Sequence, residues 1–366
     1  MTSMTNEPTS YRPNRVSAPG ETLAEILESR GISQTELAAR TGRSKQHINE
    51  IVAGKAPITH DMAIQLKRSL GAPASFPNNR EARYREHLAP QAEHERLSSQ
   101  IEWLAQFPVK EMTKLGWLKP LQDKVEQVRE LLNYFGIASP AEWRDIWSNR
   151  QFAFRKSEAF ESHLGPLSAW LRRGEVVARE IASQPFEQAR LRASLPNLRA
   201  LTLSGDPREF VPRMIELFAT AGVALVFVPE LTGCCASGVT QWLTSEKAQI
   251  QLTLRYKTDD HLWFTFFHEV GHILLHGKKE VFVEWDGSDT DKEHQANCFA
   301  SEALIPALQW KAIRSAGRYG KAAIRNFAAS VGVAPGIVVG RLQHERLLPP
   351  SHCNDLKWRY QFKVQG

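Results

Sequence analysis

The sequence has few cysteines and no long apolar run. Its 366 residues include four cysteines, with no CxxC pair among them. The adjacent Cys234 and Cys235 are poorly placed to bridge each other. This usage is typical of a reducing compartment, so we expect a cytoplasmic protein without structural disulfides. No stretch approaches the run of about 20 apolar residues that a membrane-spanning helix needs, and we expect no membrane partner.

The chain also lacks internal repeats, and residues 1–19 lack the apolar core of a signal peptide. We expect these residues to form a disordered leader. The composition is that of a globular protein, with 42% hydrophobic and 23% charged residues, and the length predicts two or three domains. The net charge of +6 permits nucleic-acid binding but does not show it.

Three zones with different residue patterns follow one another along the chain. Short helices with clear stop signals fill residues 20–80, and a helical stretch rich in Trp and Arg fills residues 81–205. We expect the middle zone to be a helical connector. A dimerisation surface or a sensor pocket within it is an alternative role. Strand-like alternation and a cluster of histidines occupy residues 206–366. The pattern predicts mainly α N-terminal and middle regions and an α+β C-terminal domain.

Capping residues and glycines outline four short helices in the first zone. Ser33 opens a capping box, Ser44 and Thr59 can each cap a later helix, and Gly42 and Gly71 follow as stops. Two short helices joined by a tight turn inside a small bundle predict a helix-turn-helix. Cationic and amide side chains surround its second helix, as DNA contacts require. An ordinary helical bundle with a solvated basic face is the alternative.

The segment from Pro19 to Gly71, and above all its core SQTELAARTG and INEIVAGK, resembles the Xre and lambda-repressor-like family. Within that family it is most similar to HigA-type antitoxins. The resemblance implies a dimeric domain that binds operator DNA, with Gln34 on a phosphate and the start of the third helix in the major groove. The expected DNA-contacting residues are Gln34, Arg43, Ser44, Lys45, Gln46, Asn49 and Lys55.

The segment HLWFTFFHEVGHILLHG has apolar residues at helical spacing, which predicts a buried helix. His268 and His272 are four residues apart, so both rings project from one face and can hold one ion. Glu269 can reach a metal-activated water without occupying the metal, as a general base must. Glu293 opens another predicted helix and supplies a carboxylate ligand, and Asn297 shares its face. Asn297 could accept a hydrogen bond from a ligand histidine and fix its tautomer.

Three protein ligands and an open position are the arrangement of a catalytic zinc ion (Zn2+). The alternative is that the two histidines are satisfied core residues and Glu293 is a solvated charge. His276 and His294 are competing ligands or structural residues, and Cys298 is a thiol near the metal or a small buried residue.

The segments LRYKTDDHLWFTFFHEVGHILLHG and EHQANCFASEALIP resemble the ImmA/IrrE family of metallopeptidases, over residues 210–345. The resemblance implies a gluzincin-like fold, zinc on His268, His272 and Glu293, and Glu269 as general base. It implies substrates that are repressors of the Xre type. Residues 324–348 resemble the family's C-terminal helices, which look like a second helix-turn-helix but are expected to be scaffold.

These patterns predict a DNA-binding regulator with a zinc-dependent endopeptidase domain. Its substrate would be a repressor, an antitoxin or its own chain. An alternative function is an antitoxin that neutralises a cognate toxin and represses its own operon, with a metal fold that is not catalytic. A third is a structural zinc, closed by His294 or Cys298, in a domain that senses a ligand.

Overall fold

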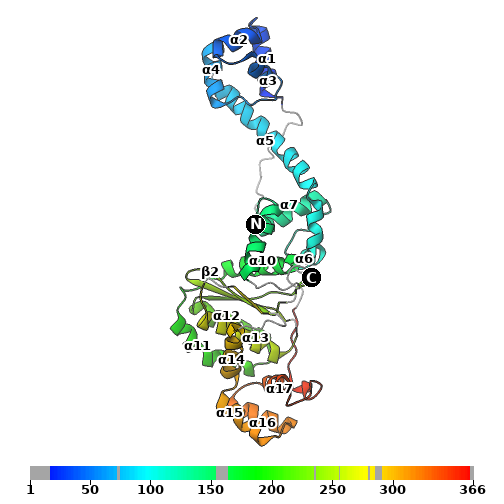
Figure 1. The fold of residues 1–366 in the computed structure, drawn as a ribbon, viewed down its shortest axis with the longest axis vertical. Helices are drawn as coiled ribbons and strands as arrows, with labels where there is room; N and C mark the ends of the chain where they lie inside the picture. The colour runs from blue at the N-terminus through cyan, green and yellow to red at the C-terminus, as the bar shows by residue number, and fades with distance from the viewer. Residues whose placement is uncertain are drawn as a thin grey trace, which may run out of the picture. The chain divides into compact units, whose positions relative to one another are not determined.

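The computed structural model describes residues 17–71, 75–153, 164–234, 236–254, 256–278, 281–284 and 291–362. The chain divides into two compact units, residues 1–100 and 101–366 (Figure 1). The expected boundaries lay near residues 80 and 205, whereas these units meet at residue 100. The part of the expected leader before residue 17 lies outside the described residues, as does Cys235.

The first unit is helical throughout. Its elements are α1 (Pro19–Ser29), α2 (Gln34–Thr41), α3 (Lys45–Val52), α4 (His60–Leu70) and α5 (Ser75–Ser98). The predicted caps form, because the hydroxyls of Ser33, Ser44 and Thr59 each accept a backbone N–H in the first turn of the next helix. Gly42 ends α2 with a φ of 67°, a left-handed conformation that favours glycine.

Apolar residues that the helical pattern assigned to inner faces form the core of this unit. Leu37 from α2 and Ile48 and Ile51 from α3 are almost completely buried, together with Met62 from α4. Helix α3 packs against α1 and α2, and α2 also packs against α4, so this packing fixes the turn between α2 and α3. The predicted helix-turn-helix is therefore formed by α2 and α3.

The second unit begins with helices that surround an aromatic cluster. These are η1 (Ile101–Gln106), α6 (Val109–Lys114), α7 (Lys124–Phe135) and α8 (Pro140–Ala153). Trp103, Phe107, Phe135 and Trp143 are buried and pack with ring centroids 5.0–6.3 Å apart. These four aromatic residues of the middle zone thus form one buried cluster.

A four-stranded sheet lies at the centre of the rest of this unit. Its strands are β1 (Val223–Phe227), β2 (Gly238–Thr244), β3 (Lys247–Leu252) and β4 (Phe282–Glu284), in the order β1-β3-β2-β4. β1 pairs parallel with β3, and the other pairs are antiparallel. Polar and apolar residues alternate in the sequence from Gln249 to Tyr256, but β3 ends at Leu252.

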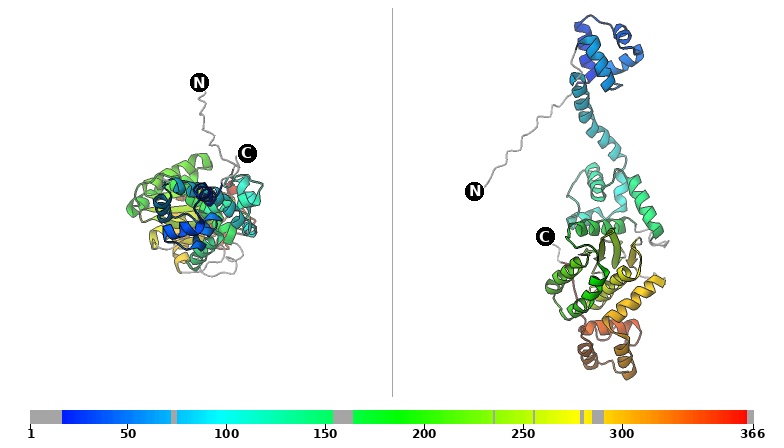
Figure 2. Two further views of the ribbon diagram at one scale, coloured as in Figure 1. Left: turned by 90° about the horizontal axis from the view of Figure 1, so that it is seen from above. Right: turned by 90° about the vertical axis from the view of Figure 1, so that its left-hand side faces the viewer.

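Helices cover both faces of the sheet (Figures 1 and 2). They are α10 (Leu164–Glu180) on one face and α11 (Gln188–Ala200), η2 (Leu201–Leu203), α12 (Pro207–Thr220) and α13 (Asp259–Leu275) on the other. Beneath α10, Gln241, Gln249 and Gln251 form a buried row linked by side-chain hydrogen bonds, and Gln251 donates to the Trp170 carbonyl. The polar side of β3 is therefore buried as completely as its apolar side.

The helix α14 (Asp291–Leu304) packs closely across α13. A Cβ atom on Gly271 would lie 3.2 Å from the Ala296 Cα, so the absence of a side chain permits this close approach. After α14 come α15 (Ala307–Ala316), α16 (Lys321–Val331), α17 (Pro335–His344) and η3 (Asn354–Leu356). The predicted fold class, a helical N-terminal region and an α+β C-terminal domain, is confirmed.

The helices α16 and α17 meet at Gly332 in a turn like that of a helix-turn-helix. However, α17 lies against α13, and Cβ atoms on Gly336 and Gly340 would clash with Asp259 and Asp260. Helix α17, which occupies the position of a recognition helix, is thus buried in the domain. Among the described helices none is long and apolar enough alone to cross a membrane, although α16 and α17 meet the length and composition criteria as a pair bent by 112°.

Candidate functional site

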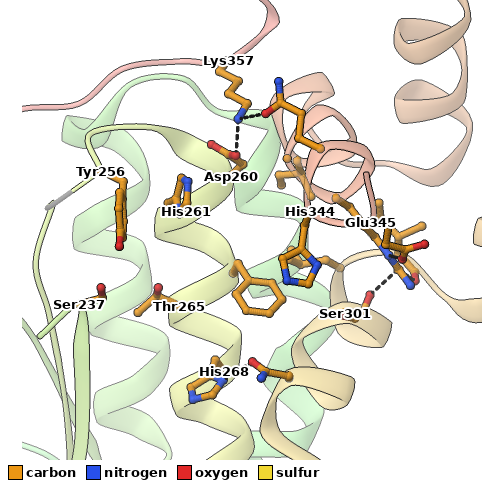
Figure 3. A pocket seen from close by; sticks show the side chains of 18 of the residues that line it. Ser237, Tyr256, Asp260, His261, Thr265, His268, Ser301, His344, Glu345 and Lys357 are labelled. Carbon is orange, nitrogen blue, oxygen red and sulfur yellow. Dashed lines mark hydrogen bonds and ion pairs between the residues drawn. The ribbon is translucent and has the colours of Figure 1, made fainter. Parts of the chain in front are cut away.

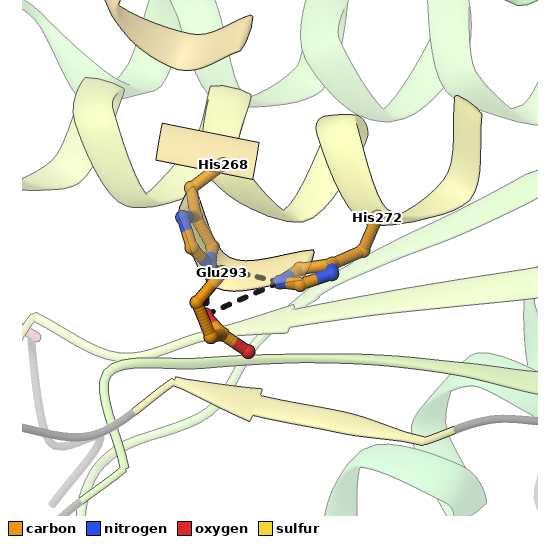
Figure 4. A group of neighbouring side chains, drawn as sticks. All are labelled: His268, His272 and Glu293. Atoms are coloured by element: carbon orange, nitrogen blue, oxygen red, sulfur yellow. Dashed lines mark hydrogen bonds and ion pairs between the residues drawn. The ribbon is translucent and has the colours of Figure 1, made fainter. Parts of the chain in front are cut away.

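Three side chains from two helices converge at the buried centre of the second unit (Figure 4). His268 Nε2 lies 2.9 Å from His272 Nε2. Glu293 Oε2 lies 3.1 Å from the first of these atoms and 3.6 Å from the second. All three ligand atoms lie within 4.8 Å of one another and could hold a metal ion. The structure therefore brings together the three predicted ligands.

The protonation of these groups suits a cation. Burial, followed by the neighbouring His268, lowers the pKa of His272 to about 4, although a hydrogen bond to Glu293 opposes the shift. Burial would raise the pKa of Glu293, but its hydrogen bonds with the two histidines outweigh this and lower the pKa to about 2. At neutral pH the cluster therefore holds a neutral imidazole and a carboxylate, which are the forms that bind a metal.

Asn297 contacts the first of the two histidines. Its Oδ1 lies 2.9 Å from His268 Nδ1, as the sequence reasoning expected. The amide oxygen can only accept, so Nδ1 carries the proton and the lone pair of Nε2 points toward the other ligand atoms.

Glu269 is completely buried beside the three ligand side chains. Thr240 Oγ1, from β2, lies 2.6 Å from Glu269 Oε2 and fixes this carboxylate oxygen. Thr240 was not predicted from the sequence, because nothing in a strand 29 residues earlier marks a partner of this helix.

The other candidate ligands lie outside the converging group. His294 and Cys298 are exposed on α14, and the metal-ligand group found among the described residues includes neither. His276 lies directly after α13, which ends at Leu275. Its Nδ1 lies 3.0 Å from His272 Nδ1, and its Nε2 lies 3.3 Å from Gln295 Oε1. Gln295 was not predicted to be part of the site.

A pocket of about 480 Å³ opens beside the converging ligands and is lined by side chains of α13, α14 and α17 (Figure 3). His268, Glu293 and Asn297 lie at one end of its wall, and Phe264 and Ile337 add apolar surface. At the opposite end, Asp260 is paired with Lys357, and both are buried. The pocket could admit a peptide segment to the metal-ligand group.

The predicted DNA-contacting residues gather on the first unit. Five of them are exposed, and Gln34 and Arg43 are half-buried. The exposed ones are Ser44, Lys45, Gln46, Asn49 and Lys55. Ser44 caps α3, Gln46 Nε2 donates to Glu50, and Arg43 pairs with Asp61 and donates to Gln65. Within this unit Arg43 is therefore already engaged by side chains of α4.

Comparisons with known families match two separate segments. Residues 23–76 match a helix-turn-helix family, and residues 244–343 match the family of IrrE N-terminal-like domains. The second match contains His268, Glu269, His272, Glu293 and Asn297.

Two solved structures are each similar to about a quarter of the chain. One is an antidote protein of a plasmid maintenance system from Nostoc punctiforme PCC 73102, with 32% identity, 24% of this chain and 96% of that chain covered, and a TM-score of 0.22. The other is an addiction module antidote protein of the HigA family from Coxiella burnetii, with 27% identity, 23% and 94% covered, and a TM-score of 0.21. A search of curated proteins gave no match. The two resemblances stated from the sequence are thus confirmed as segment matches: residues 23–76 match an Xre-like helix-turn-helix family, and residues 244–343 match an IrrE/ImmA-like metallopeptidase family.

Proposed function

We propose that this protein is a cytoplasmic DNA-binding regulator whose second unit is a zinc-dependent endopeptidase. The observation that carries the proposal is the convergence of His268 Nε2, His272 Nε2 and Glu293 Oε2, with Glu269 beside them and a pocket adjoining. A solvated Glu293 or two unrelated core histidines would not produce this arrangement.

The donor set fits zinc. Ligand atoms held about 2.0–2.1 Å from one ion in tetrahedral geometry lie about 3.3 Å apart. The separations here are 2.9, 3.1 and 3.6 Å, so small side-chain adjustments are enough. Two imidazole nitrogens and one carboxylate oxygen leave a fourth position open, as a catalytic rather than a structural zinc requires.

A zinc ion held here would supply Lewis acidity to a water molecule and to the carbonyl of the scissile peptide bond. The Glu269 carboxylate would accept a proton from the attacking water and return it to the leaving amine. Thr240 keeps one oxygen of the Glu269 carboxylate in place, and Asn297 keeps His268 oriented. The near-complete burial of Thr240, His268 and Glu269 limits the access of bulk water to the proton path.

The substrate we propose is a protein of the Xre repressor or antitoxin class, or this chain itself. The support is the ImmA/IrrE resemblance together with a helix-turn-helix domain on the same chain. The first unit would bind operator DNA as a homodimer, through the exposed residues at the start of α3. Cleavage would then change the occupancy of an operator.

The test compares the wild-type protein with Glu269→Gln and with Glu302→Gln, a control on the exposed side of α14. Bound zinc is measured, and cleavage of the protein itself and of repressors encoded beside it is followed. We expect zinc in all three proteins and cleavage by the wild type and Glu302→Gln only. Equal cleavage by wild type and Glu269→Gln, or no zinc in any of them, would contradict the proposal. Neutralisation of a toxin that survives Glu269→Gln, without cleavage, would favour the antitoxin function.

A further inference from the structure

The ring of His276 lies behind His272, on the side away from Glu293. Helix α13 ends at Leu275, and the extended backbone of His276, with φ −118° and ψ 168°, leaves the helical path. His276 Nδ1 lies 3.0 Å from His272 Nδ1, and His276 Nε2 lies 3.3 Å from Gln295 Oε1. Phe282 from β4 stacks on His272 with ring centroids 4.1 Å apart. The side chains of Gln295, His276 and His272 thus form a chain of contacts that ends at His272, a predicted metal ligand.

The direction of the hydrogen bonds in this chain follows from the donors and acceptors. Gln295 Oε1 can only accept, so His276 Nε2 carries a proton. A neutral imidazole protonated at Nε2 has a lone pair at Nδ1. His276 Nδ1 therefore accepts, and His272 Nδ1 donates. The same rule then leaves the lone pair of His272 at Nε2, the atom that faces His268 and Glu293.

The opposite direction would prevent metal binding. If the Gln295 amide donated instead, His276 would donate from Nδ1, and His272 would carry its proton at Nε2. That proton would point at the position a metal ion must take. Only a chain that begins with an accepting Gln295 oxygen is compatible with an ion held by His272.

We propose that Gln295 and His276 form a relay that fixes the tautomer and the orientation of His272 for metal binding. They are positioning residues, and the relay rests on the proposed function in that it presupposes a metal site. The relay parallels the direct contact of Asn297 with His268. Two carboxamide side chains of α14 thus orient the two histidines of α13: Asn297 contacts His268 directly, and Gln295 acts on His272 through His276. His276 itself is not a ligand in this arrangement, because its nearer nitrogen faces Nδ1 of His272 and not the ligand atoms.

The experiment measures the zinc Kd of the full chain by competition with a chromogenic chelator. The variants are His276→Phe, which keeps an aromatic ring beside Phe282, Gln295→Leu, Gln295→Glu and the pair His276→Phe/Gln295→Leu. His352→Phe, at an exposed histidine beyond α17, is the matched control. Loss of a hydrogen-bond partner of a metal-bound histidine weakens metal affinity about 10- to 100-fold.

The relay predicts weaker zinc binding for His276→Phe and for Gln295→Leu, and no further loss in the pair, since both substitutions interrupt one chain. Gln295→Glu should bind zinc more tightly than the wild type, because a carboxylate is a stronger acceptor. A role in packing alone predicts no effect of the exposed Gln295 and no gain from glutamate. Wild-type affinity in His276→Phe, or an effect of His276→Phe without one of Gln295→Leu, would overturn the relay while leaving the metal site intact. Absence of zinc from the wild type would instead contradict the proposed function.

Discussion

Thr240 Oγ1 lies 2.6 Å from Glu269 Oε2 and 3.0 Å from the Glu269 carbonyl oxygen. Both residues are completely or almost completely buried, so water does not compete for the contact. A hydroxyl has one proton to donate, and the shorter distance indicates that it goes to the carboxylate. A strand residue thus holds the acidic side chain that we propose as general base.

We expect Thr240→Val to lower kcat for peptide cleavage about 10- to 100-fold while zinc content stays unchanged. The reason is the loss of one hydrogen bond to a charged group, about 1.5–3 kcal/mol. Valine has nearly the shape of threonine, so packing against α13 is kept. The measurement is steady-state cleavage together with zinc analysis. Thr240→Ser restores the hydroxyl and should recover most of the rate; a serine variant as slow as the valine variant would contradict the role of the hydroxyl.

Asn297→Ala should weaken zinc binding about 10- to 100-fold, because His268 loses the acceptor that fixes its tautomer. Asn297→Asp should bind zinc at least as tightly as the wild type, since a carboxylate accepts the same proton. Ser301→Ala, one turn further along the same helix, is the control and should have wild-type affinity. Chelator competition measures all three, and equal affinities for wild type and Asn297→Ala would refute the contact's role.

Removal of the metal should lower the thermal stability of the second unit. An ion present at 100 times its Kd stabilises the folded state by about 2.7 kcal/mol. In a domain of this size that corresponds to a Tm difference of roughly 5–10 °C. We expect zinc to raise the Tm of the chelator-treated wild type and not that of His272→Ala, as measured by calorimetry. A zinc-induced shift of the same size in His272→Ala would mean that the stabilising ion binds elsewhere.

The stability of the second unit should also depend on Asp259. Burial, followed by the neighbouring Asp260, raises the pKa of Asp259 from 3.8 to about 7. Since the folded pKa is above the unfolded one, the neutral carboxyl is favoured in the folded state, and stability is lost as pH rises from about 4 to about 7. Asp259→Asn should match the wild type below pH 4 and be more stable by a few kcal/mol, about 2–4, above pH 7. Urea unfolding at pH 4, 6 and 8 checks this, and a constant difference between the two proteins at all three would refute it.

Local signals in the sequence were sufficient to predict the helix-turn-helix and the helix that carries His268 and His272. The serine caps and Gly42 have local physical effects, and the spacing of His268 and His272 brings both rings to one face of any helix. Glu293 and Asn297 were recognisable because they share a face of a second helix. Each of these inferences depends on contacts within one or two turns.

The parts that were missed depend on contacts between distant segments. Gln249 and Gln251 alternate with apolar residues like the solvated side of a strand, yet α10 covers them and their amides satisfy one another. Thr240 and Gln295 became part of the site only because β2 and α14 pack against α13. The short strand β4 has only three residues and pairs with the start of β2, so no alternation could be recognised in it.

Two substitutions in the first unit distinguish recognition of DNA bases from sequence-independent electrostatic attraction to DNA. Gln46 is exposed near the start of α3, where its amide can reach base edges once it releases Glu50, while Lys55 is an exposed cation after the helix. Gln46→Ala should reduce the preference for operator over unrelated DNA by about 1–3 kcal/mol. Lys55→Ala should instead weaken binding to all sequences alike and reduce the salt slope by about 1. Titrations with both DNAs at several salt concentrations distinguish the two effects. Equal losses on operator and unrelated DNA for Gln46→Ala would mean that α3 contacts the backbone and reads no base at this position.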